Sequence, residues 1–360
     1  MILSPQSQLL ERNLNLFENG EWLLINPSDS YFLDALKHQE ITVLHQYFDI
    51  FSECTRETHC ARFDSRDIDV NGFEVTHKIG NHTHSFTPFS RNENTHTDAL
   101  IFLPKSKSHF QMLLRMAGGI VRPGGHIHVV GENKGGIKSA AKLMQQYGAT
   151  QKIDSARHCS LISTTIEESH PAFEPQAWLD TASYQIADIT WPVVSLPGVF
   201  SHGELDNGTK LLLEKHLSCL SGTVLDFACG AGVIASYLMH RYPHIKMQLS
   251  DVSSLAIYSS AMTLAANNQS ARLYAANALH GITDKVQHIV TNPPFHTGLK
   301  TDYTITKRFI EDARKLLTQD GTLQMVANRF LPYPGLLDES FPRVLTTAQT
   351  TQFSLYQAAL

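Results

Sequence analysis

Short apolar segments alternate with amphipathic segments throughout the second half of the chain. The apolar segments have the length of strands and cover residues 223–227, 246–249, 272–275, 288–291 and 322–327. The segments between them have helical spacing of apolar positions and include residues 233–241, 254–267 and 306–317. Strands separated by helices of this length pair in parallel, so the pattern predicts an α/β fold with helices on both faces of the sheet. Ligands are then expected at the carboxyl ends of the strands.

The first half repeats this order of elements with weaker patterning. Strands are expected over residues 22–25 and 100–103, and helices over 32–37 and 109–117. The segment Arg122-Pro-Gly-Gly-His-Ile-His-Val-Val-Gly-Glu-Asn resembles Gln319-Asp-Gly-Thr-Leu-Gln-Met-Val-Ala-Asn. In each, an amphipathic helix is followed by a glycine turn and then by a strand. This similarity favours an internal duplication.

Between the halves, residues 170–197 contain several prolines and lack a clear period, which predicts a surface linker. We therefore expect a first domain over residues 1–169, a linker over 170–197 and a second domain over 198–360. The functional residues of the second half, described below, do not recur in the first. We expect the first domain to be structural or to bind the substrate.

Composition indicates a well-buried globular protein, with 42% hydrophobic and 18% charged residues. The formal net charge of −5 argues against strong, indiscriminate binding to nucleic acid, although it leaves room for a local basic patch. The N-terminus lacks a signal-peptide pattern, and no apolar run approaches the roughly 20 residues that span a bilayer. We expect a cytoplasmic protein with no membrane partner.

The five cysteines are odd in number and scattered, as is typical of a reducing cytosol: Cys54, Cys60, Cys159, Cys219 and Cys229. Cys54, His59 and Cys60 lie close together, but no second Cys/His pair has the spacing of a zinc finger. We therefore predict no metal site.

The turn after the strand at 223–227 has the composition of a ligand-binding turn. It runs Asp226-Phe-Ala-Cys-Gly-Ala-Gly232, and its glycines allow positive φ angles and close approach of a ligand to backbone N–H groups. The G-x-G-x-x-G spacing of a nicotinamide-dinucleotide site is missing. The turn resembles instead the D-x-G-x-G-x-G turn of class I S-adenosylmethionine-dependent methyltransferases, with Ala228 at the first glycine.

Three further residues follow strands at the same predicted edge of the sheet. Asp251 closes the second strand and can accept both ribose hydroxyls of a nucleoside, or it can cap the next helix. Val252 is placed to pack against an adenine ring. Asn277, after the third strand, can bond the adenine amino edge or serve as a turn residue. The predicted cofactor-binding residues are Asp226, Ala228, Gly230, Gly232, Asp251, Val252 and Asn277.

The tetrapeptide Asn292-Pro293-Pro294-Phe295 follows the fourth strand and matches the (D/N/S)-P-P-(Y/F) signature of amino methyltransferases. The Asn292 side-chain oxygen and the Pro293 carbonyl can both accept hydrogen bonds from one exocyclic NH2 group, while the Phe295 ring stacks on a planar substrate. Two acceptors partly localise the lone pair of an aromatic amine, and a cofactor sulfonium supplies the methyl group. We predict these four residues as catalytic.

A wider similarity points to one family. Residues 196–201, 205–213, 292–298 and 326–334 together resemble the ribosomal RNA small subunit methyltransferase C family. The resemblance covers residues 196–345 and extends to the first half only as architecture. It implies two tandem class I (Rossmann-like) methyltransferase domains, the N-terminal one degenerate, with S-adenosyl-L-methionine as cofactor. It also implies that the nucleophile is the N2 amine of a guanosine in 16S ribosomal RNA.

The expected partner is therefore 16S ribosomal RNA or the small ribosomal subunit, bound by a monomer. Phe200 and Ser201 are expected to form a lid over the cofactor. The candidate RNA contacts are basic residues, each of which can equally be a solvated surface charge: Lys134, Lys138, Lys300, Lys307, Arg308 and Arg329.

Several alternatives remain open for a protein with such a tetrapeptide. The nearest is the guanine-N2 methyltransferase of large-subunit 23S ribosomal RNA. Adenine-N6 DNA methyltransferases and glutamine-N5 protein methyltransferases use a similar clamp. Ala228 also motivates a non-catalytic, RNA-binding factor of ribosome assembly.

Overall fold

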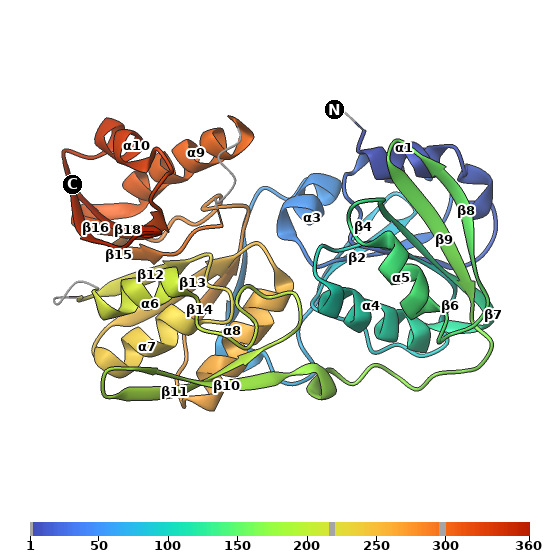
Figure 1. Cartoon of the computed structure of the whole chain (residues 1–360), viewed down its shortest axis with the longest axis horizontal. Helices are drawn as coiled ribbons and strands as arrows, with labels where there is room; N and C mark the ends of the chain where they lie inside the picture. The colour runs from blue at the N-terminus through green and yellow to red at the C-terminus, as the bar shows by residue number, and fades with distance from the viewer. Residues whose placement is uncertain (1–2, 216–219, 295–299) are drawn as a thin grey trace. The chain divides into compact units, whose positions relative to one another are not determined.

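The computed structural model describes residues 3–215, 220–294 and 300–360, the last from 305 onward with side chains. The chain divides into two compact units (Figure 1). Unit 1 comprises Met1–Glu57 and Val70–Leu179, and unit 2 comprises Thr58–Asp69 and Asp180–Leu360. No helix within the described ranges combines the length and the apolar character needed to cross a bilayer.

Unit 2 is built on an eight-stranded sheet with the order β17-β18-β16-β15-β12-β13-β14-β3. Its five central strands are parallel, as predicted: β12 (Thr223–Phe227), β13 (Lys246–Asp251), β14 (Arg272–Ala275), β15 (Val286–Thr291) and β16 (Leu317–Asn328). The edges are extended by antiparallel strands: β3 (Ala61–Asp64), β17 (Arg343–Gln349) and β18 (Phe353–Ala359). The parallel core is therefore closed off by antiparallel strands on both sides.

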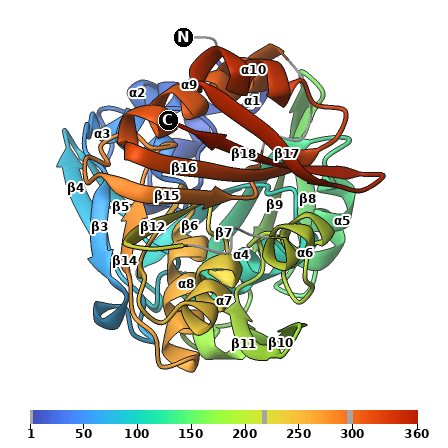
Figure 2. The ribbon, with the colours of Figure 1, turned by 90° about the vertical axis from the view of Figure 1, so that its left-hand side faces the viewer.

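Helices cover both faces of this sheet (Figure 2). One face carries α6 (Asn207–Glu214), α7 (Val233–Arg241) and α8 (Ser254–Ala266), and the other carries α9 (Lys300–Leu316) and α10 (Tyr333–Ser340). Phe227 of β12 stacks on Phe309 of α9, with ring centroids 4.2 Å apart and planes at 19°. This buried contact supports the sheet directly beneath the end of β12.

The segment predicted as a surface linker, residues 170–197, contains regular secondary structure over much of its length. After a short 3₁₀ helix, η3 (Pro175–Trp178), the chain forms an antiparallel hairpin of β10 (Asp180–Ile186) and β11 (Ile189–Ser195). Pro192 conceals the strand pattern, but a two-stranded ribbon has free edges on which a proline loses no ladder bond. The hairpin is fastened to α8, because Thr263 Oγ1 bonds both the N–H and the carbonyl of Val194 at 2.9 and 3.0 Å.

A segment from within the predicted first domain also folds with unit 2. Strand β3 pairs antiparallel with β14, and a 3₁₀ helix, η2 (Ser65–Asp67), follows it. Ser65 Oγ accepts a hydrogen bond from the Ala271 N–H at 3.0 Å, and the Cys60 thiol donates to the Gly281 carbonyl at 3.2 Å. The chain therefore enters unit 2 once before it completes unit 1, which a division at a single linker cannot describe.

Unit 1 has an eight-stranded sheet of the order β4-β5-β2-β1-β6-β7-β9-β8. Its strands are β1 (Trp22–Ile25), β2 (Ile41–His45), β4 (Val75–Ile79), β5 (His82–Phe86), β6 (His96–Phe102), β7 (Val121–Glu132), β8 (Thr150–Ala156) and β9 (Cys159–Thr165). Strand by strand, the order and the directions repeat those of unit 2. The expectation that the first half follows the same plan is confirmed at the level of topology.

The helices of unit 1 are α1 (Pro5–Glu11), η1 (Leu14–Phe17), α2 (Tyr31–Ala35), α3 (Phe48–Thr55), α4 (Lys107–Ile120) and α5 (Ile137–Met144). Helix α1 packs on β7, β8 and β9, whereas α3 packs on β2, β4 and β5. The amphipathic helix predicted over residues 109–117 is the central part of α4, whose N-cap Ser106 accepts a hydrogen bond from the His109 N–H.

Candidate functional site

The carboxyl ends of the central strands of unit 2 meet at one edge of the sheet. Phe227 at the end of β12 pairs with Ser250 of β13 on one side and Thr291 of β15 on the other. Thr291 Oγ1 donates to the Phe227 carbonyl at 2.8 Å and fixes these two strand ends together. The glycine turn, Asp251 and Asn292 therefore lie next to one another, although they are separated by up to 66 residues of sequence (292 minus 226).

The glycine turn leaves one surface open. Ala228, Gly230 and Gly232 all have positive φ angles, of 57°, 54° and 74°. Among the described residues, the nearest neighbour of a Cβ atom added at Gly230 would be Val199 Cγ1, at 3.9 Å, whereas one at Gly232 would meet Ser260 at 3.2 Å. The Ser260 hydroxyl donates to the Gly230 carbonyl at 2.9 Å. Ser260 thus supports the turn, and the space beside Gly230 is left open for a ligand to approach closely.

Asp251 is tied to the same turn through its carboxylate. Oδ2 accepts from the Gly230 N–H at 3.0 Å and Oδ1 from the Ser253 N–H at 2.9 Å. Burial raises the pKa of Asp251, while these backbone bonds act in the opposite direction. Helix α8 begins at Ser254 with Ser253 as its N-cap, so Asp251 is not the cap residue. Backbone N–H groups of Gly230, Ser253 and Val252 thus fix the carboxylate in place, and its recognition of ribose hydroxyls stays a prediction.

Asp226 lies beneath the turn, where solvent does not reach it. Its side chain has no exposed surface, and Oδ2 accepts a hydrogen bond from the Ala235 N–H in α7 at 3.1 Å. Oδ1 has no hydrogen-bond partner within the described part of the chain, and burial raises the pKa of this carboxyl well above its usual range. In this structure Asp226 holds α7 and the turn together, and its predicted role in cofactor binding stays a prediction.

Val252 and Asn277 lie at the same edge. Val252 is half-buried directly after Asp251. The Ala276 N–H donates to the Asp251 carbonyl at 3.1 Å, which holds the end of β14 beside the end of β13. Asn277 is exposed, and its carbonyl accepts from the His280 N–H at 3.1 Å in a turn. The structure therefore leaves both the adenine-binding and the turn interpretations of Asn277 in place.

Asn292 is held in one orientation by two residues that the sequence did not single out as functional. Its Nδ2 donates to Asp206 Oδ2 at 2.8 Å and to Thr209 Oγ1 at 3.0 Å. Asp206 is the N-cap of α6 and also accepts from the Thr209 N–H at 2.8 Å. Both amide hydrogens of Asn292 are thereby engaged, and its Oδ1 accepts no hydrogen bond among the described residues. The Asp-Asn-Gly-Thr sequence is a recognisable N-cap, but only the fold shows what else the cap binds.

The other members of the tetrapeptide are described in part. Pro293 is buried and Pro294 is exposed. Phe295 lies outside the described residues, as does the segment 296–299 that follows it. Its role as a stacking surface therefore stays a prediction.

The segment expected to form a lid lies near the glycine turn. Val199 approaches Gly230, and Phe200 is 54% exposed. The carbonyl of Ser201, which has a φ of 55°, accepts from the Tyr184 hydroxyl at 3.4 Å. An exposed aromatic ring next to the open face of the turn is consistent with a lid, which stays a prediction.

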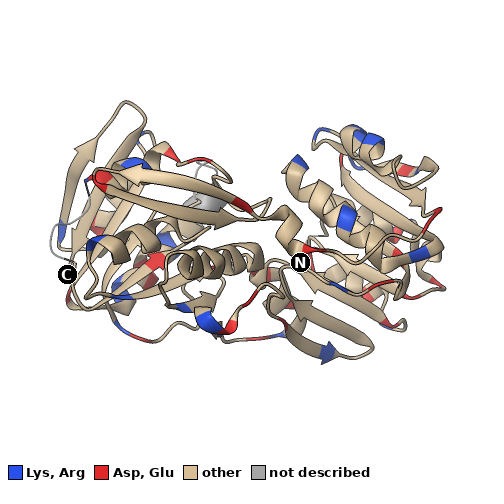
Figure 3. Cartoon of the chain, turned by 90° about the horizontal axis from the view of Figure 1, so that it is seen from below, with Lys and Arg blue, Asp and Glu red and all other residues tan. Residues whose placement is uncertain are grey.

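The basic residues expected to contact RNA are mostly paired with acids or dispersed. Lys307 forms an ion pair with Glu339 at 2.9 Å, and Arg308 lies 3.9 Å from Asp312. Lys134 and Lys138 are exposed in unit 1, and the side chain of Lys300 lies outside the described residues. Figure 3 shows Lys and Arg scattered among Asp and Glu in both units.

Arg329 offers the clearest candidate contact. It is exposed directly after β16, and the neighbouring Phe330 is 74% exposed. Strand β16 pairs with β15, so this loop follows a strand adjacent to the one that carries Asn292. A cation beside an exposed ring is the combination that single-stranded nucleic acid contacts favour.

Known proteins share both halves of this architecture. Residues 190–357 match the methyltransferase small domain, and residues 7–182 match the methyltransferase small domain N-terminal family. The chain is 69% identical to ribosomal RNA small subunit methyltransferase C of Alteromonas mediterranea, with all 360 residues of each chain covered. It is 42% identical to the protein of that name from Pseudoalteromonas atlantica, over 99% of both chains.

The chain belongs to the ribosomal RNA small subunit methyltransferase C family. The resemblance drawn from the sequence is thus confirmed, and it extends over the first half as well. A solved structure of a 16S rRNA N2 methyltransferase of T. thermophilus, in complex with AdoMet and guanosine, has the same fold. It superposes with a TM-score of 0.82 at 20% identity, covering 99% of this chain and 92% of that chain. The prediction of two tandem methyltransferase folds is confirmed.

Proposed function

We propose that this protein transfers a methyl group from S-adenosyl-L-methionine to the exocyclic N2 amine of a guanosine in 16S ribosomal RNA. The orientation of the Asn292 amide carries the proposal. Its two hydrogens are bound to Asp206 and Thr209, which leaves Oδ1, without a hydrogen bond from the described residues, to accept one from a substrate amine. Family membership supports the same reaction, since its members are named for methylation of small-subunit ribosomal RNA.

The residues around the glycine turn fit the cofactor. The space beside Gly230 is open to a ligand, and the Asp251 carboxylate, which backbone N–H groups hold in place, accepts hydrogen bonds from the ribose hydroxyls. Bound there, S-adenosyl-L-methionine supplies a methyl group activated by a sulfonium. Asp226 and Ser260 keep the turn in the conformation that exposes the Gly230 backbone.

The clamp makes the guanine amine nucleophilic. Asn292 Oδ1 and the Pro293 carbonyl accept the two N2 hydrogens and partly localise the nitrogen lone pair. That pair forms the new bond to the methyl carbon as the carbon–sulfur bond breaks, and the electrons of the broken bond stay on sulfur. The surplus N2 proton leaves to water. Catalysis by this arrangement is mainly positioning and desolvation.

We also propose that unit 2 carries the catalytic machinery and that unit 1 is structural or binds RNA. The active form is a cytoplasmic monomer that engages 16S ribosomal RNA or the small subunit. Phe295 stacks on the guanine, and Phe200 and Ser201 cover the cofactor. Arg329 and Phe330 contact nucleotides that flank the target.

A non-catalytic binding factor is the second candidate, because Ala228 has a φ of 57° where a glycine is favoured. The strain is small compared with the binding energy of a cofactor. The intact hydrogen bonds of Asn292 favour catalysis, since a binding factor has no need of a fixed acceptor at that position.

Methyl transfer from labelled S-adenosyl-L-methionine tests the proposal. Unmodified small-subunit and large-subunit RNA are offered naked and as assembled subunits, and the product nucleoside is identified. We expect N2-methylguanosine in 16S RNA. We expect Asn292→Ala to lower kcat by roughly 10² to 10³-fold, a cost typical of losing one preorganised polar contact.

The matched control is Asn92→Ala, which removes an exposed amide in unit 1 and should leave kcat unchanged. Calorimetry should show cofactor binding nearly intact in Asn292→Ala. Product in 23S RNA alone would replace the proposed substrate, and cofactor binding without any product would favour the binding factor.

A further inference from the structure

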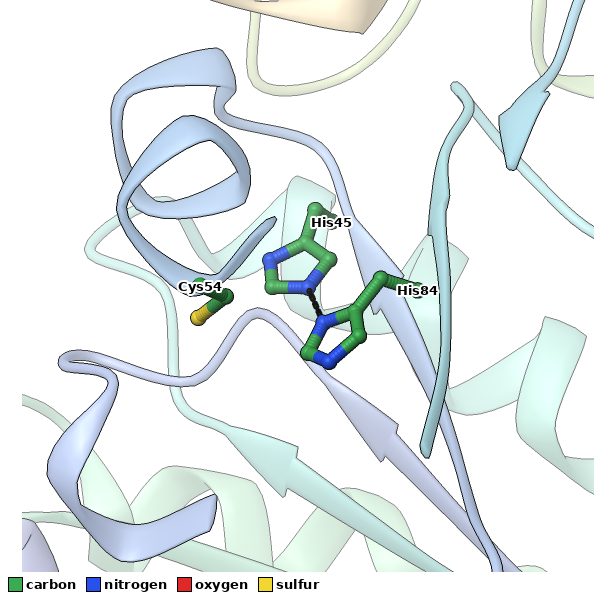
Figure 4. A group of neighbouring side chains, drawn as sticks. All are labelled: His45, Cys54 and His84. Carbon is green, nitrogen blue, oxygen red and sulfur yellow. Dashed lines mark hydrogen bonds between the residues drawn. The ribbon is translucent and has the colours of Figure 1, made fainter. Parts of the chain in front are cut away.

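Two histidines and one cysteine form a compact group in unit 1 (Figure 4). His45 is the last residue of β2, His84 lies on the adjacent strand β5, and Cys54 lies on α3, which packs on both strands. One ligand atom from each, an imidazole nitrogen or the thiol sulfur, lies within 4.8 Å of the other two. Three separate elements thus bring together side chains that commonly bind transition metals.

The hydrogen bonding of this group is incomplete. His45 Nε2 and His84 Nδ1 lie 3.0 Å apart and share one hydrogen bond. His45 Nδ1 is buried and has no hydrogen-bond partner in the described part of the chain. Leaving a buried polar atom unsatisfied costs roughly 1 to 3 kcal/mol, so the group is poorly explained as a purely structural contact.

The electrostatic surroundings suit a cation. Burial lowers the pKa of His84 to about 4 and that of His45 well below its usual value, so both rings are neutral and able to coordinate. Burial raises the pKa of Cys54 to about 12, and the carboxylates of Glu53, Asp29 and Asp34 act in the same direction. Negative charge that disfavours a thiolate in an empty site also attracts a positive ion, which stabilises the thiolate on binding.

We propose that His45, Cys54 and His84 form a binding site for a thiophilic divalent cation of the Zn²⁺ class. The two neutral imidazoles and the thiolate supply three ligands, and water takes the remaining tetrahedral position. Binding releases the thiol proton of Cys54 to solvent. The ion then links α3 to strands β2 and β5. This function goes beyond methyl transfer, which uses residues of unit 2.

A second group in unit 1 has a simpler explanation. Asp98 lies 3.1 Å from His126 and 3.7 Å from His128, so a carboxylate already contacts both rings, although His128 Nδ1 has no hydrogen-bond partner among the described residues. The group also lacks a thiol, which makes the two groups distinguishable by spectroscopy. Spacing along the sequence did not predict the His45–Cys54–His84 site, because the two histidines lie on neighbouring strands and are 39 residues apart.

Cobalt substitution tests the proposal directly. Untagged, full-length protein is stripped with a chelator, reduced, and titrated anaerobically with Co²⁺. We expect one equivalent to produce a thiolate-to-cobalt charge-transfer band and the intense visible bands of a tetrahedral site, and Zn²⁺ to displace both. In Cys54→Ser the charge-transfer band should disappear. The affinity of Cys54→Ser for Co²⁺ should fall by more than roughly 100-fold. A loss of that size exceeds the range expected when a residue only orients a metal ligand.

Two control variants separate ligation from general damage. Cys60→Ser removes a thiol that bonds the Gly281 carbonyl in unit 2, and His38→Ala removes an exposed histidine of unit 1. Both should keep the full cobalt spectrum. Thermal unfolding with and without Zn²⁺ should show stabilisation of the wild type that Cys54→Ser lacks. A wild type without the charge-transfer band, or a band that persists in Cys54→Ser, overturns the proposal.

Discussion

The two units differ in what lies at the carboxyl ends of equivalent strands. Ile25 ends β1 in unit 1 as Phe227 ends β12 in unit 2, and each is followed by a residue in the left-handed region: Asn26 at 56° and Ala228 at 57°. In unit 2 the backbone beyond this point is open at Gly230. In unit 1 the corresponding region is filled by the protein's own polar side chains.

The polar side chains in this region of unit 1 form a hydrogen-bond network around Gln46. Gln46 Oε1 accepts from Asn26 Nδ2 at 2.8 Å and from His109 Nε2 at 2.7 Å. Gln46 Nε2 donates to the Pro88 carbonyl at 2.6 Å, and the Gln46 N–H donates to Asn26 Oδ1 at 2.7 Å. The Gln46 side-chain oxygen thus accepts two hydrogen bonds and its nitrogen donates one, all within unit 1, so these groups hold the strand ends together and not a nucleoside.

The clamp position differs as clearly. Ile25 pairs with Ile101 as Phe227 pairs with Thr291, so Phe102 of unit 1 takes the place of Asn292. Phe102 is buried and offers no acceptor to an amine. Since the two units share one sheet topology, we propose that the residues at the strand ends, and not the sheet, determine function.

Acid should destabilise unit 1 at His109, because protonation places a charge on a buried ring. Burial lowers the pKa of His109 to about 4, from 6.5. The neutral ring is the stable form in the folded state, so the stability it contributes is complete above 6.5 and is lost as pH falls through this window. A shift of this size corresponds to roughly 3 kcal/mol.

Urea unfolding at about pH 7 and about pH 4.5 measures this loss. Between these two pH values, the free energy of unfolding should fall further in the wild type than in His109→Gln. The difference should be a large part of the roughly 3 kcal/mol given above. His38→Gln, at an exposed position, should keep the slope of the wild type. Equal slopes in all three proteins would mean that His109 titrates normally.

Removal of the Asp251 carboxylate should weaken the open site of unit 2. We expect Asp251→Ala to reduce cofactor affinity by roughly 1 to 3 kcal/mol, the value of hydrogen bonds to a charged group. Isothermal calorimetry on the full chain should show one cofactor site in the wild type. Asp188→Ala, on the exposed β10–β11 turn, should bind like the wild type. A second site that persists in Asp251→Ala would show that unit 1 also binds the cofactor.

Loss of the Asp206 carboxylate should release the amide of Asn292. We expect Asp206→Ala to lower kcat about tenfold, or about 1.4 kcal/mol, with cofactor affinity unchanged. Asp206→Asn retains an acceptor for both the Asn292 amide and the α6 cap, and it should restore most of the rate. Equal rates in Asp206→Asn and Asp206→Ala would indicate that charge matters here and amide orientation does not.

The sequence predicted the elements of unit 2 closely because the period of its apolar positions changes clearly between strands and helices. Strands β12 and β14 and helix α7 have the predicted ends. Three features were beyond local patterns. Strand β3 depends on a partner more than 200 residues away, and the β10–β11 hairpin is concealed by Pro192. Capping chemistry predicts that Asp206 starts a helix, but not that it also binds Asn292.

The smallest expected effect concerns the residue that the two units place in the left-handed region. Asparagine tolerates this conformation, as at Asn26, whereas in alanine it costs roughly 1 to 2 kcal/mol. Ala228→Gly should relieve that strain at the cost of a more flexible unfolded chain, for a net stabilisation of about 1 kcal/mol or less. Thermal unfolding should show a slightly higher Tm.

The same substitution within a helix provides the contrast. Ala235→Gly, in the buried part of α7, should destabilise the protein by about 1 kcal/mol. Ala187→Gly, at a φ of 51° in the β10–β11 turn, should stabilise it like Ala228→Gly and leave cofactor binding unchanged. Destabilisation by Ala228→Gly would mean that the Ala228 methyl group makes packing contacts worth more than the backbone strain. The departure from the first glycine of the class I methyltransferase turn would then be compensated within the turn.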